Sequence, residues 1–519
     1  MWARNPHLNC ICRIGEISSW QDPFGFGRIP RMKNRQLDFF GRDTELAELD
    51  GLWTKRIASL VTCRGRRRIG KSTLIEEFAR RSGARFIKLE GLRPKKGMTE
   101  NDQLAFFAAK LSAQTGCDKT PPSDWYSAFV RLDRELVDRD RKVVLLDEIS
   151  WMAQFSLTFP EILKNAWDDL FRKRPNLVLV LCGSVSSWIR DEIVENRAYV
   201  GRRSLDIVVG ELPPAECLKF WGKRADRMDP REIIDVLSVT GGVPRYLEEV
   251  KPNLSAIENI KRLCFTPKSV LREDFDDMFN DVITEQPRFS ARVLRTFVDG
   301  AKTATEVADA LGITKGGDVT AAIANMVEAG FLAEAGQINP ETGRELRERR
   351  FRLRDNYARF YLKCIEPHTR IIDDGAFDFA SLDELEGYDS IMGLAFENLV
   401  VNNYRLLLPL LHLDGVVITS AGPYLRRATT GVRGRKGCQV DLLIQTRRTV
   451  CVVEVKRMRE ISRDIIAEVD RKVRAIKRKD GVSIRTALVY DGHLAPITRA
   501  DGYFDAIVPF SKMLGITNS

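Results

Sequence analysis

A glycine-rich turn near the start of the chain joins an expected strand to an expected helix. The strand is RIASLVTC at residues 56–63, the turn is GRRRIGKST at 65–73, and the amphipathic run LIEEFARR follows. Gly65 and Gly70 let the backbone curl so that successive N–H groups face one anion, and the helix N-terminus adds its positive end. This part of the chain is therefore predicted to be an α/β unit that binds phosphate.

The spacing G-x-x-x-x-G-K-S is that of a P-loop. In a P-loop, Lys71 reaches the outer phosphates of ATP and Ser72 offers its hydroxyl to Mg²⁺. Three consecutive arginines leave a second interpretation open, a glycine turn beside a basic surface loop. We expect the whole turn to bind nucleotide: Gly65, Arg66, Arg67, Arg68, Ile69, Gly70, Lys71, Ser72 and Thr73.

A second expected strand ends in two acids. The run RKVVLLDEIS at 141–150 places Asp147 at the end of an apolar strand, with Glu148 directly after it. Asp147 is expected to hold Mg²⁺ through water and Glu148 to polarise the attacking water, and an acidic helix cap is the alternative. A third strand at 177–183 leads to Ser184, which either senses the γ-phosphate or caps a helix.

Six segments occur in an order that resembles the archaeal-type ATPases of the AAA-related signal-transduction NTPase group, which are similar to origin-recognition initiators. The resemblance covers about residues 37–280 and rests on FFGRDTEL, GRRRIGKST, VVLLDE, LVLCGS, AYVGRR and TGGVPRYL. It implies a parallel sheet with helices on both faces, which the alternation of expected strands and helices also favours.

The same resemblance implies roles for residues outside the P-loop. Gly41 and Arg42 match the Gly-Arg that lies near the nucleotide base in this group of ATPases. Gly242 and Pro244 match the motif that begins a helical lid. Arg202 matches a recurrent arginine with a phosphate-facing or intersubunit role.

Residues 288–355 predict three helices followed by two strands around a polar loop. The second helix is ATEVADALG at 304–312 and the third is DVTAAIANMVEAGFL at 318–332, each apolar at helical spacing. The order resembles a winged helix-turn-helix, whose third helix enters the major groove of DNA. Asp318 and Glu328 on that helix keep a protein–protein module open as the alternative. The predicted DNA contacts are Thr314, Lys315, Thr320, Arg344, Arg347, Arg349 and Arg350.

Near the C-terminus, the run CQVDLLIQTRRTVCVVEVK at 438–456 is typical of a buried hairpin but carries charges in its strands. A turn at 447–448 puts Asp441 directly opposite Glu454, and Lys456 shares the face of Glu454. Like charges that face each other destabilise a plain sheet. Mg²⁺ or Mn²⁺ bound between the two carboxylates reverses that effect, so the hairpin predicts a metal site.

An apolar run upstream, LAFENLV at 394–400, carries one acid, Glu397, which is expected to join the hairpin from a helix. A helical acid, a strand Asp and a Glu-x-Lys on the next strand resemble the PD-(D/E)xK nuclease core, over roughly residues 390–480. The archaeal-type ATPases often carry such a domain. The resemblance implies metal-dependent DNA cleavage, carried out by Glu397, Asp441, Glu454 and Lys456.

The resemblance has one departure, because Cys438 and Gln439 stand where the motif has its proline. A nuclease fold that binds without cutting is therefore the alternative. Basic residues near the hairpin are expected to hold a phosphate backbone. They are Arg426, Arg427, Arg433, Arg435, Lys436 and Lys472.

A chain of 519 residues is too long for one hydrophobic core. No apolar run reaches the roughly 18 residues of a membrane span, and the ten scattered cysteines favour a reducing cytoplasm. Met32 is a candidate for the true start. The predicted divisions are a disordered leader at 1–36, a P-loop ATPase core at 37–225, a helical lid at 226–284, a winged helix at 285–364, a linker at 365–389 and a nuclease-like domain at 390–519.

The net charge of +10 permits a polyanionic partner without requiring one. We therefore expect a cytoplasmic ATP-binding and ATP-hydrolysing switch coupled to a DNA-binding, metal-dependent nuclease domain. The winged helix could also serve a homo-oligomer or a partner protein. The alternative function is an ATP-switched DNA-binding regulator or scaffold whose nuclease fold is inactive.

Overall fold

The computed structural model describes residues 39–516, apart from several short gaps. The gaps are residues 56, 138–139, 184–185, 283–285, 315, 336–337, 347–348, 378–380 and 427–436. The predicted leader lies outside the described residues, as do Ser184, Lys315, Arg347 and the basic residues within 427–436. Within the described part of the chain, no helix is long and apolar enough to cross a membrane. The cysteines in that part are free thiols.

Five parallel strands form the first sheet, in the order β2-β3-β4-β1-β5. They are β1 (Ser59–Arg64), β2 (Arg85–Glu90), β3 (Lys142–Asp147), β4 (Leu177–Gly183) and β5 (Arg203–Val208). Parallel neighbours need crossover connections, which explains why helices alternate with these strands. The predicted α/β fold with a parallel sheet is confirmed.

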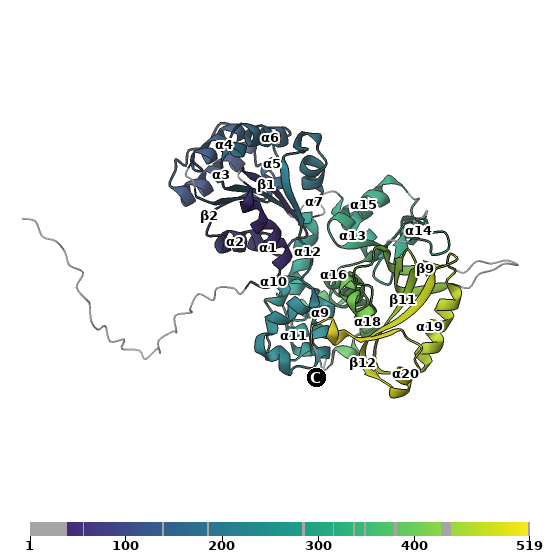
Figure 1. Ribbon diagram of the computed structural model, residues 1–519. Coiled ribbons are helices and arrows are strands. Elements are labelled where there is room, and N and C mark those ends of the chain that lie inside the picture. The colour runs from purple at the N-terminus through teal and green to yellow at the C-terminus, as the bar shows by residue number, and fades with distance from the viewer. Residues whose placement is uncertain are drawn as a thin grey trace, which may run out of the picture. The chain divides into compact units, whose positions relative to one another are not determined.

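Helices cover both faces of this sheet (Figure 1). They are α1 (Asp43–Asp50), α2 (Lys71–Arg81), α3 (Glu100–Thr115), α4 (Trp125–Arg134), α5 (Ile149–Ala153), α6 (Phe159–Asp169) and α7 (Ser186–Ile189). Short 3-10 or π turns complete the unit: η1 (Gly51–Thr54), η2 (Phe171–Lys173), η3 (Arg190–Val194) and η4 (Arg197–Tyr199). β3 and β4 are buried at every position because they lie between the two helical layers.

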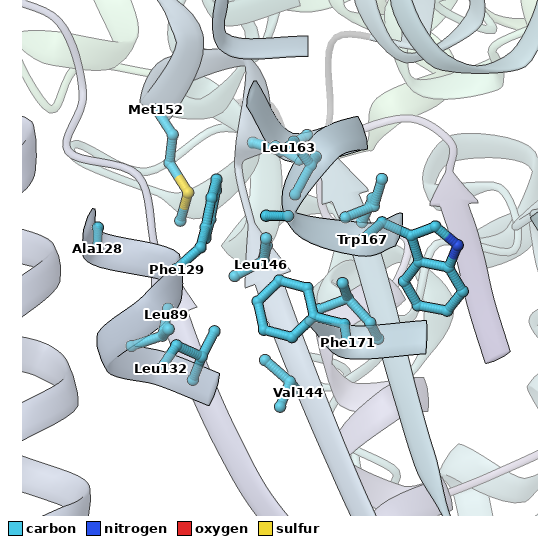
Figure 2. Close-up of a cluster of buried hydrophobic side chains, with 14 of the residues drawn as sticks. Leu89, Ala128, Phe129, Leu132, Val144, Leu146, Met152, Leu163, Trp167 and Phe171 are labelled. Carbon is cyan, nitrogen blue, oxygen red and sulfur yellow. The ribbon is translucent and has the colours of Figure 1, made fainter. Parts of the chain in front are cut away.

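The core on one face of the sheet is rich in aromatic side chains (Figure 2). Phe129 of α4 and Trp167 of α6 lie there above Val144 and Leu146 of β3. On the helices, the apolar residues recur at helical spacing, so each helix buries one stripe. This packed layer fixes β3, and with it the acids at the carboxyl end of that strand.

Helices follow the first sheet, and α9 to α12 lie in the segment predicted as a lid. They are α8 (Pro214–Cys217), η5 (Leu218–Arg227), α9 (Pro230–Thr240), α10 (Pro244–Leu247), α11 (Ala256–Cys264) and α12 (Val270–Val282). Proline at the first position starts α9 and α10, where its missing N–H costs nothing. A capping box between Ser255 and Glu258 starts α11.

The middle segment contains the three helices and the antiparallel strands expected from its sequence. They are α13 (Pro287–Arg295), β6 (Lys302–Thr303), α14 (Ala304–Leu311), α15 (Gly317–Glu328), β7 (Leu332–Ala335) and β8 (Arg350–Leu353), with strand order β6-β8-β7. Thr303 and Glu306 form a capping box at α14. Val319, Ile323 and Met326 form the buried stripe of α15.

The segment predicted as a linker, 365–389, contains short helices in its described part. The elements that follow β8 are α16 (Asn356–Phe360), η6 (Tyr361–Ile365), η7 (Glu366–His368), α17 (Thr369–Asp373) and η8 (Leu382–Glu384). Ile372, Leu382 and Leu385 are buried, so this stretch packs against the rest of the molecule. The acidic composition of the segment gives no indication that these three apolar residues are buried.

A mixed sheet forms the C-terminal part, in the order β13-β12-β11-β10-β9. Its strands are β9 (Ile418–Arg426), β10 (Cys438–Thr446), β11 (Thr449–Ile461), β12 (Ser483–Leu494) and β13 (Ala506–Pro509). The accompanying helices are α18 (Tyr388–Asn402), η9 (Tyr404–Leu407), η10 (Pro409–Leu411), α19 (Asp464–Ala475), α20 (Pro496–Ala500) and η11 (Phe510–Lys512). Both α18 and α19 pack on β10 and β11.

The register predicted for the hairpin is confirmed over its antiparallel pairs. Leu442 pairs with Val453, and the pairing continues to Gln445 with Val450. The next positions along the two strands are Asp441 and Glu454. Because Val450 and Val452 lie in the core that α19 covers, Glu454 also points toward α19.

Candidate nucleotide site and candidate acidic site

The glycine turn lies between β1 and α2, as the spacing predicts. Gly65 adopts φ +148°, and a Cβ at this position would collide with the backbone oxygen of Val209. Gly70 adopts φ +86° at the N-cap of α2, and a Cβ there would lie 3.8 Å from Pro244 of α10. Positive φ favours glycine at both positions, and at Gly65 the close approach of Val209 also excludes a side chain. The structure therefore brings Pro244, from the predicted lid motif, to the P-loop.

The predicted magnesium ligands of the nucleotide site lie together. The Ser72 hydroxyl donates a hydrogen bond of 2.7 Å to Oδ2 of Asp147, although the two residues are 75 positions apart. Lys71 Nζ donates to the carbonyl oxygens of Gly65 and Arg66, each at 3.0 Å. A hydroxyl and a carboxylate in contact form a hard oxygen pair that suits Mg²⁺.

Lys88 belongs to the same site, although no sequence motif points to it. Its Nζ lies 3.3 Å from Oδ2 of Asp147. It reaches the acid because β2 pairs with β3 in register, which sets Glu90 beside Asp147 and Lys88 two positions earlier. Glu148, predicted to polarise water, follows Asp147 with φ +48° and caps α5. Its backbone N–H donates to Oδ1 of Asp147 at 3.1 Å.

Arg42 reaches the P-loop, but its side chain is bonded to backbone. Its guanidinium donates to the carbonyl oxygen of Ile69 at 3.1 Å and to that of Gly210 at 2.6 Å. Burial lowers the pKa of Arg42. At Gly41, with φ +71°, a Cβ would lie within 3.2 Å of Leu212 and Glu216. Arg42 therefore holds the P-loop backbone at Ile69 and connects it to Gly210.

Two P-loop arginines form ion pairs with residues far along the chain. Arg66 pairs with Asp355, and its guanidinium also lies 3.5 Å from Glu211. Arg68 pairs with Asp274, which also accepts a hydrogen bond of 2.7 Å from the Tyr246 hydroxyl. The alternative of a basic surface loop does not describe these side chains, because Arg66 is buried and both arginines are paired.

The other residues predicted at the nucleotide site differ in their surroundings. Ile69 is buried and Thr73 is exposed on α2. Arg67 is partly buried. Arg202 forms a bidentate ion pair with Asp168 of α6, with both N–O distances 2.8 Å. Hydrogen bonds from Arg202 lower the pKa of Asp168 to about 2. The structure therefore shows Arg202 bonded within its own chain.

One predicted DNA contact of the middle segment is wrong. Arg350 is buried on β8, where it donates to Glu306 at 2.7 Å and to the carbonyl oxygen of Ala301 at 2.9 Å. Arg350 is the first residue of β8, whereas Arg349 lies directly before the strand and is exposed. Of the other predicted contacts that the structure describes, Thr314, Thr320, Arg344 and Arg349 are exposed.

Glu328 on α15 is partly buried and paired with two arginines. Its carboxylate lies 3.1 Å from Arg64, at the end of β1, and 2.9 Å from Arg190. Arg64 directly precedes the P-loop glycine. Together with the Arg66–Asp355 pair, this contact joins the strand and turn of the nucleotide site to the middle segment.

The acids of the C-terminal hairpin meet lysines from the strand and from α19. Glu454 is completely buried. Lys456 Nζ lies 3.0 Å from Oε1 of Glu454, which confirms that these two residues share a face. Lys472 Nζ lies 2.7 and 2.6 Å from the two carboxylate oxygens of Glu454. Glu468 completes the group, at 3.0 Å from Lys456.

Asp441 and Glu397 lie close enough to Glu454 for their charges to interact. Burial, followed by the charge of Asp441, raises the pKa of Glu454 and raises that of Glu397 to about 8. Burial also raises the pKa of Asp441, whose Oδ2 accepts the Val455 N–H at 2.9 Å. The structure therefore gathers the four residues predicted for a nuclease site, Glu397, Asp441, Glu454 and Lys456.

A pocket of about 920 Å³ opens beside these acids. Its acidic wall is formed by Glu397, Asp441 and Glu468, and its basic wall includes Arg426, Arg471, Lys472, Arg474 and Lys477. Carboxylate oxygens are suitable donors for Mg²⁺ or Mn²⁺. Among the described residues, however, no three Asp, Glu, His or Cys side chains are grouped as a ready metal site. The chemistry of the donors fits a cation, but both oxygens of Glu454 already bind ammonium groups.

Residues 39–250 match the sequence model of a family described as an ATPase domain found predominantly in Archaea. An uncharacterized protein of Methanocaldococcus jannaschii is 24% identical over 364 residues, which are 69% of this chain and 75% of that protein. The family match and the strand order together support a P-loop ATPase in the first half of the chain.

Solved structures similar to this chain include a Walker-type ATPase of Pyrococcus abyssi, 17% identical with a TM-score of 0.47. That likeness covers 64% of this chain and 98% of the other. The ORC2 protein of Aeropyrum pernix, solved as ADPNP and ADP complexes, is 15% identical with a TM-score of 0.41. This second likeness covers 65% of this chain and 95% of the ORC2 chain.

Proposed function

We propose that this chain is an ATP-binding and ATP-hydrolysing switch that controls a DNA-binding, metal-dependent nuclease-like domain at its C-terminus. The Ser72–Asp147 contact and the braced glycine turn support the nucleotide site. The buried ion pair between Arg66 and Asp355 is the main support for coupling between the nucleotide site and the C-terminal domain.

Asp355 transmits the state of the P-loop to the helix that follows it. Its carboxylate caps α16 by accepting the Ala358 N–H at 2.8 Å, and it also pairs with Arg66. A nucleotide that draws Arg66 toward its phosphates would remove one partner of a buried carboxylate, which is costly. ATP therefore favours a different position of α16, since a ligand shifts an equilibrium through unequal contacts in two states.

From α16 the contacts continue to the helix that carries an acid of the C-terminal site. Asn356 donates a hydrogen bond of 3.0 Å to the carbonyl oxygen of Ala395, and Asn398 donates to Asn356 at 3.1 Å. Ala395 and Asn398 flank Glu397 in α18. A movement of α16 would consequently displace Glu397 relative to the hairpin acids.

DNA is the proposed partner of the middle and C-terminal segments. The exposed residues Thr314, Thr320, Arg344 and Arg349 are available to a duplex on the winged-helix interpretation. The basic wall of the 920 Å³ pocket places positive charge beside the acids, as contact with a phosphate backbone requires. A winged helix that binds protein is the competing interpretation. At the C-terminal end of α15 the ion pair between Glu328 and Arg64 favours it, because this end of the helix contacts protein.

In the acidic site, Glu397, Asp441 and Glu454 would hold Mg²⁺ or Mn²⁺, which supplies Lewis acidity to a phosphoryl oxygen when bound. Lys456 contacts both Glu454 and Glu468 at 3.0 Å, so its ammonium is held in a defined place at the pocket. From there it can orient a water molecule or stabilise negative charge on the phosphate.

The direct test incubates linear and circular DNA with the protein and Mg²⁺ or Mn²⁺, with and without ATP. Wild-type protein is expected to cut, and Asp441→Ala and Glu454→Ala are expected to lose cutting. Glu386→Gln, an exposed acid before α18, serves as a control for the loss of one carboxylate charge. If wild-type protein shows no metal-dependent cutting in either condition, the alternative of an ATP-switched regulator or scaffold replaces the nuclease.

A further inference from the structure

Lys472 lies where a cation is needed between the acids of the C-terminal site. Its Nζ contacts both carboxylate oxygens of Glu454, at 2.6 and 2.7 Å. Glu454 is completely buried, so its charge has no water to stabilise it. An ammonium that bridges both oxygens takes one lone-pair site on each of the two atoms that a metal ion would need.

The fold explains why a lysine from α19 can reach this acid. Val469 of α19 packs in the same core as Val450 and Val452, on the face of β11 that also carries Glu454. Lys472 lies three positions after Val469, so it projects from nearly the same side of α19. Its carbonyl oxygen accepts a hydrogen bond from the Cys438 thiol at 3.6 Å, which ties this part of α19 to β10.

From this geometry we infer that Lys472 is the built-in counter-ion of the acidic site and competes with a divalent cation for Glu454. The metal binds only when the Lys472 ammonium withdraws from that carboxylate. The inference rests on the proposed function in so far as the site takes a metal, but it concerns metal affinity and not cutting.

A second acid offers the displaced ammonium another partner. Glu468 lies one helical turn before Lys472, and their charged atoms are 3.3 Å apart. Glu468 is partly exposed at the pocket, whereas Glu454 is completely buried. When a cation takes the buried acid, Lys472 can keep an ion pair by moving to the exposed acid. Glu468 therefore lowers the free-energy cost of replacing the Lys472 ammonium at Glu454 with a divalent cation.

Mn²⁺ binding to the nucleotide-free, full-length protein tests this exchange. All proteins carry Asp147→Asn, which removes the acid of the nucleotide site as a competing ligand. Binding is followed by the loss of the electron paramagnetic resonance signal of free Mn²⁺. Lys472→Met is expected to bind Mn²⁺ at least about tenfold more tightly, within the usual range of coupling between two competing ligands. Glu468→Gln is expected to weaken binding.

Arg471→Met is the matched control, because Arg471 lines the same pocket from the adjacent position of α19 but bonds to the carbonyl oxygen of Ala467. It removes one positive charge without freeing Glu454, so it should change Mn²⁺ affinity by less than about twofold. Adding Asp441→Asn to Lys472→Met should abolish the gain. Equal or weaker binding by Lys472→Met, or an equal gain in Arg471→Met, overturns the inference.

Lys472→Met also takes from the buried Glu454 carboxylate the ammonium that bridges both its oxygens and leaves it Lys456 on Oε1, which destabilises the metal-free fold. Mn²⁺ should therefore raise its thermal unfolding midpoint more than that of wild-type protein. Lys472→Gln keeps a hydrogen-bond donor near Glu454 and provides the same comparison if the methionine variant does not fold. The inference is also contradicted if Mn²⁺ raises the thermal unfolding midpoint of Lys472→Gln no more than it raises that of wild-type protein. If the protein does not cut DNA but Lys472→Met still binds Mn²⁺ more tightly than wild-type protein, only the proposed nuclease activity is contradicted.

Discussion

Arg66 in the glycine turn and Asp355 at the start of α16 form a buried ion pair although 289 positions separate them. The pair links the phosphate-binding loop to the segment that leads into the C-terminal domain. Arg68 makes a second link to Asp274 of α12. The turn that would receive ATP is therefore bonded to two later parts of the chain.

Replacement of Asp355 with Asn should uncouple the two ends of the molecule. The variant removes the buried partner of Arg66 and leaves it only the more distant Glu211, at 3.5 Å, so the free energy of unfolding should fall by up to about 3–5 kcal/mol. ATP should still bind, but it should no longer change the DNA affinity of the protein. Fluorescence anisotropy with labelled DNA, with and without ATP, measures the response.

Asp374→Asn removes an exposed acid near α17 and is the control for that experiment. It should leave both the stability and the ATP response close to those of wild-type protein. An ATP response that survives unchanged in Asp355→Asn would show that the coupling does not pass through this pair.

Lys71→Ala should reduce ATP hydrolysis to background. Lys71 is the cation at the start of α2 beside the loop, and phosphates lose their main charged contact without it. Release of inorganic phosphate measures turnover, and Lys110→Ala on the exposed side of α3 is the control. Turnover that persists in Lys71→Ala would refute the P-loop assignment.

Two glycine substitutions should have opposite effects. Gly65→Ala forces a Cβ into the backbone oxygen of Val209 at φ +148°, so it should destabilise the protein by more than about 1 kcal/mol. Gly51→Ala adds a methyl group in open space at φ −58°, so it should be neutral or stabilising by about 0.4–1 kcal/mol. Thermal unfolding compares them, and equal effects would argue against the tight turn.

The stability of the metal-free protein should fall as pH rises because of Glu397. Burial and the Asp441 charge raise the pKa of Glu397 from 4.5 to about 8. The folded state therefore holds a proton that the unfolded chain releases, and stability is lost between those two values as pH rises. In EDTA, Glu397→Gln should have a higher unfolding midpoint than wild-type protein at pH 9, a difference that shrinks toward pH 5.

Glu386→Gln, which replaces an exposed acid in the same part of the chain, is the control for the loss of one carboxylate charge. A constant difference between Glu397→Gln and wild-type protein from pH 5 to pH 9 would mean that Glu397 is ionised throughout.

Strand periodicity and local spacing were enough to predict much of the two sites. The glycine spacing located the P-loop, and the position of Asp147 after an apolar run located its acidic partner. The two-residue alternation predicted the pairing of the hairpin, which the structure confirms from Leu442–Val453 to Gln445–Val450. These features depend on neighbours in sequence, where short-range geometry is reliable.

Contacts between distant elements could not be predicted in this way. Nothing in the sequence near Arg66 indicates Asp355, and nothing near Glu454 indicates that Lys472 approaches from α19. Lys472 was expected to hold a phosphate backbone, whereas the structure pairs it with Glu454. Arg350 differs from the exposed Arg344 and Arg349 because it is the residue at which β8 begins and pairs with β6.

Hydrogen–deuterium exchange of α16 and α18, with and without a non-hydrolysable ATP analogue, tests the coupling most directly. The analogue should change exchange in both helices of wild-type protein. Exchange should not change in Lys71→Ala, and in Asp355→Asn the response should be confined to the P-loop and α2. An analogue that binds wild-type protein and alters the P-loop, yet leaves α16 and α18 unchanged, would contradict coupling between the nucleotide site and the C-terminal site.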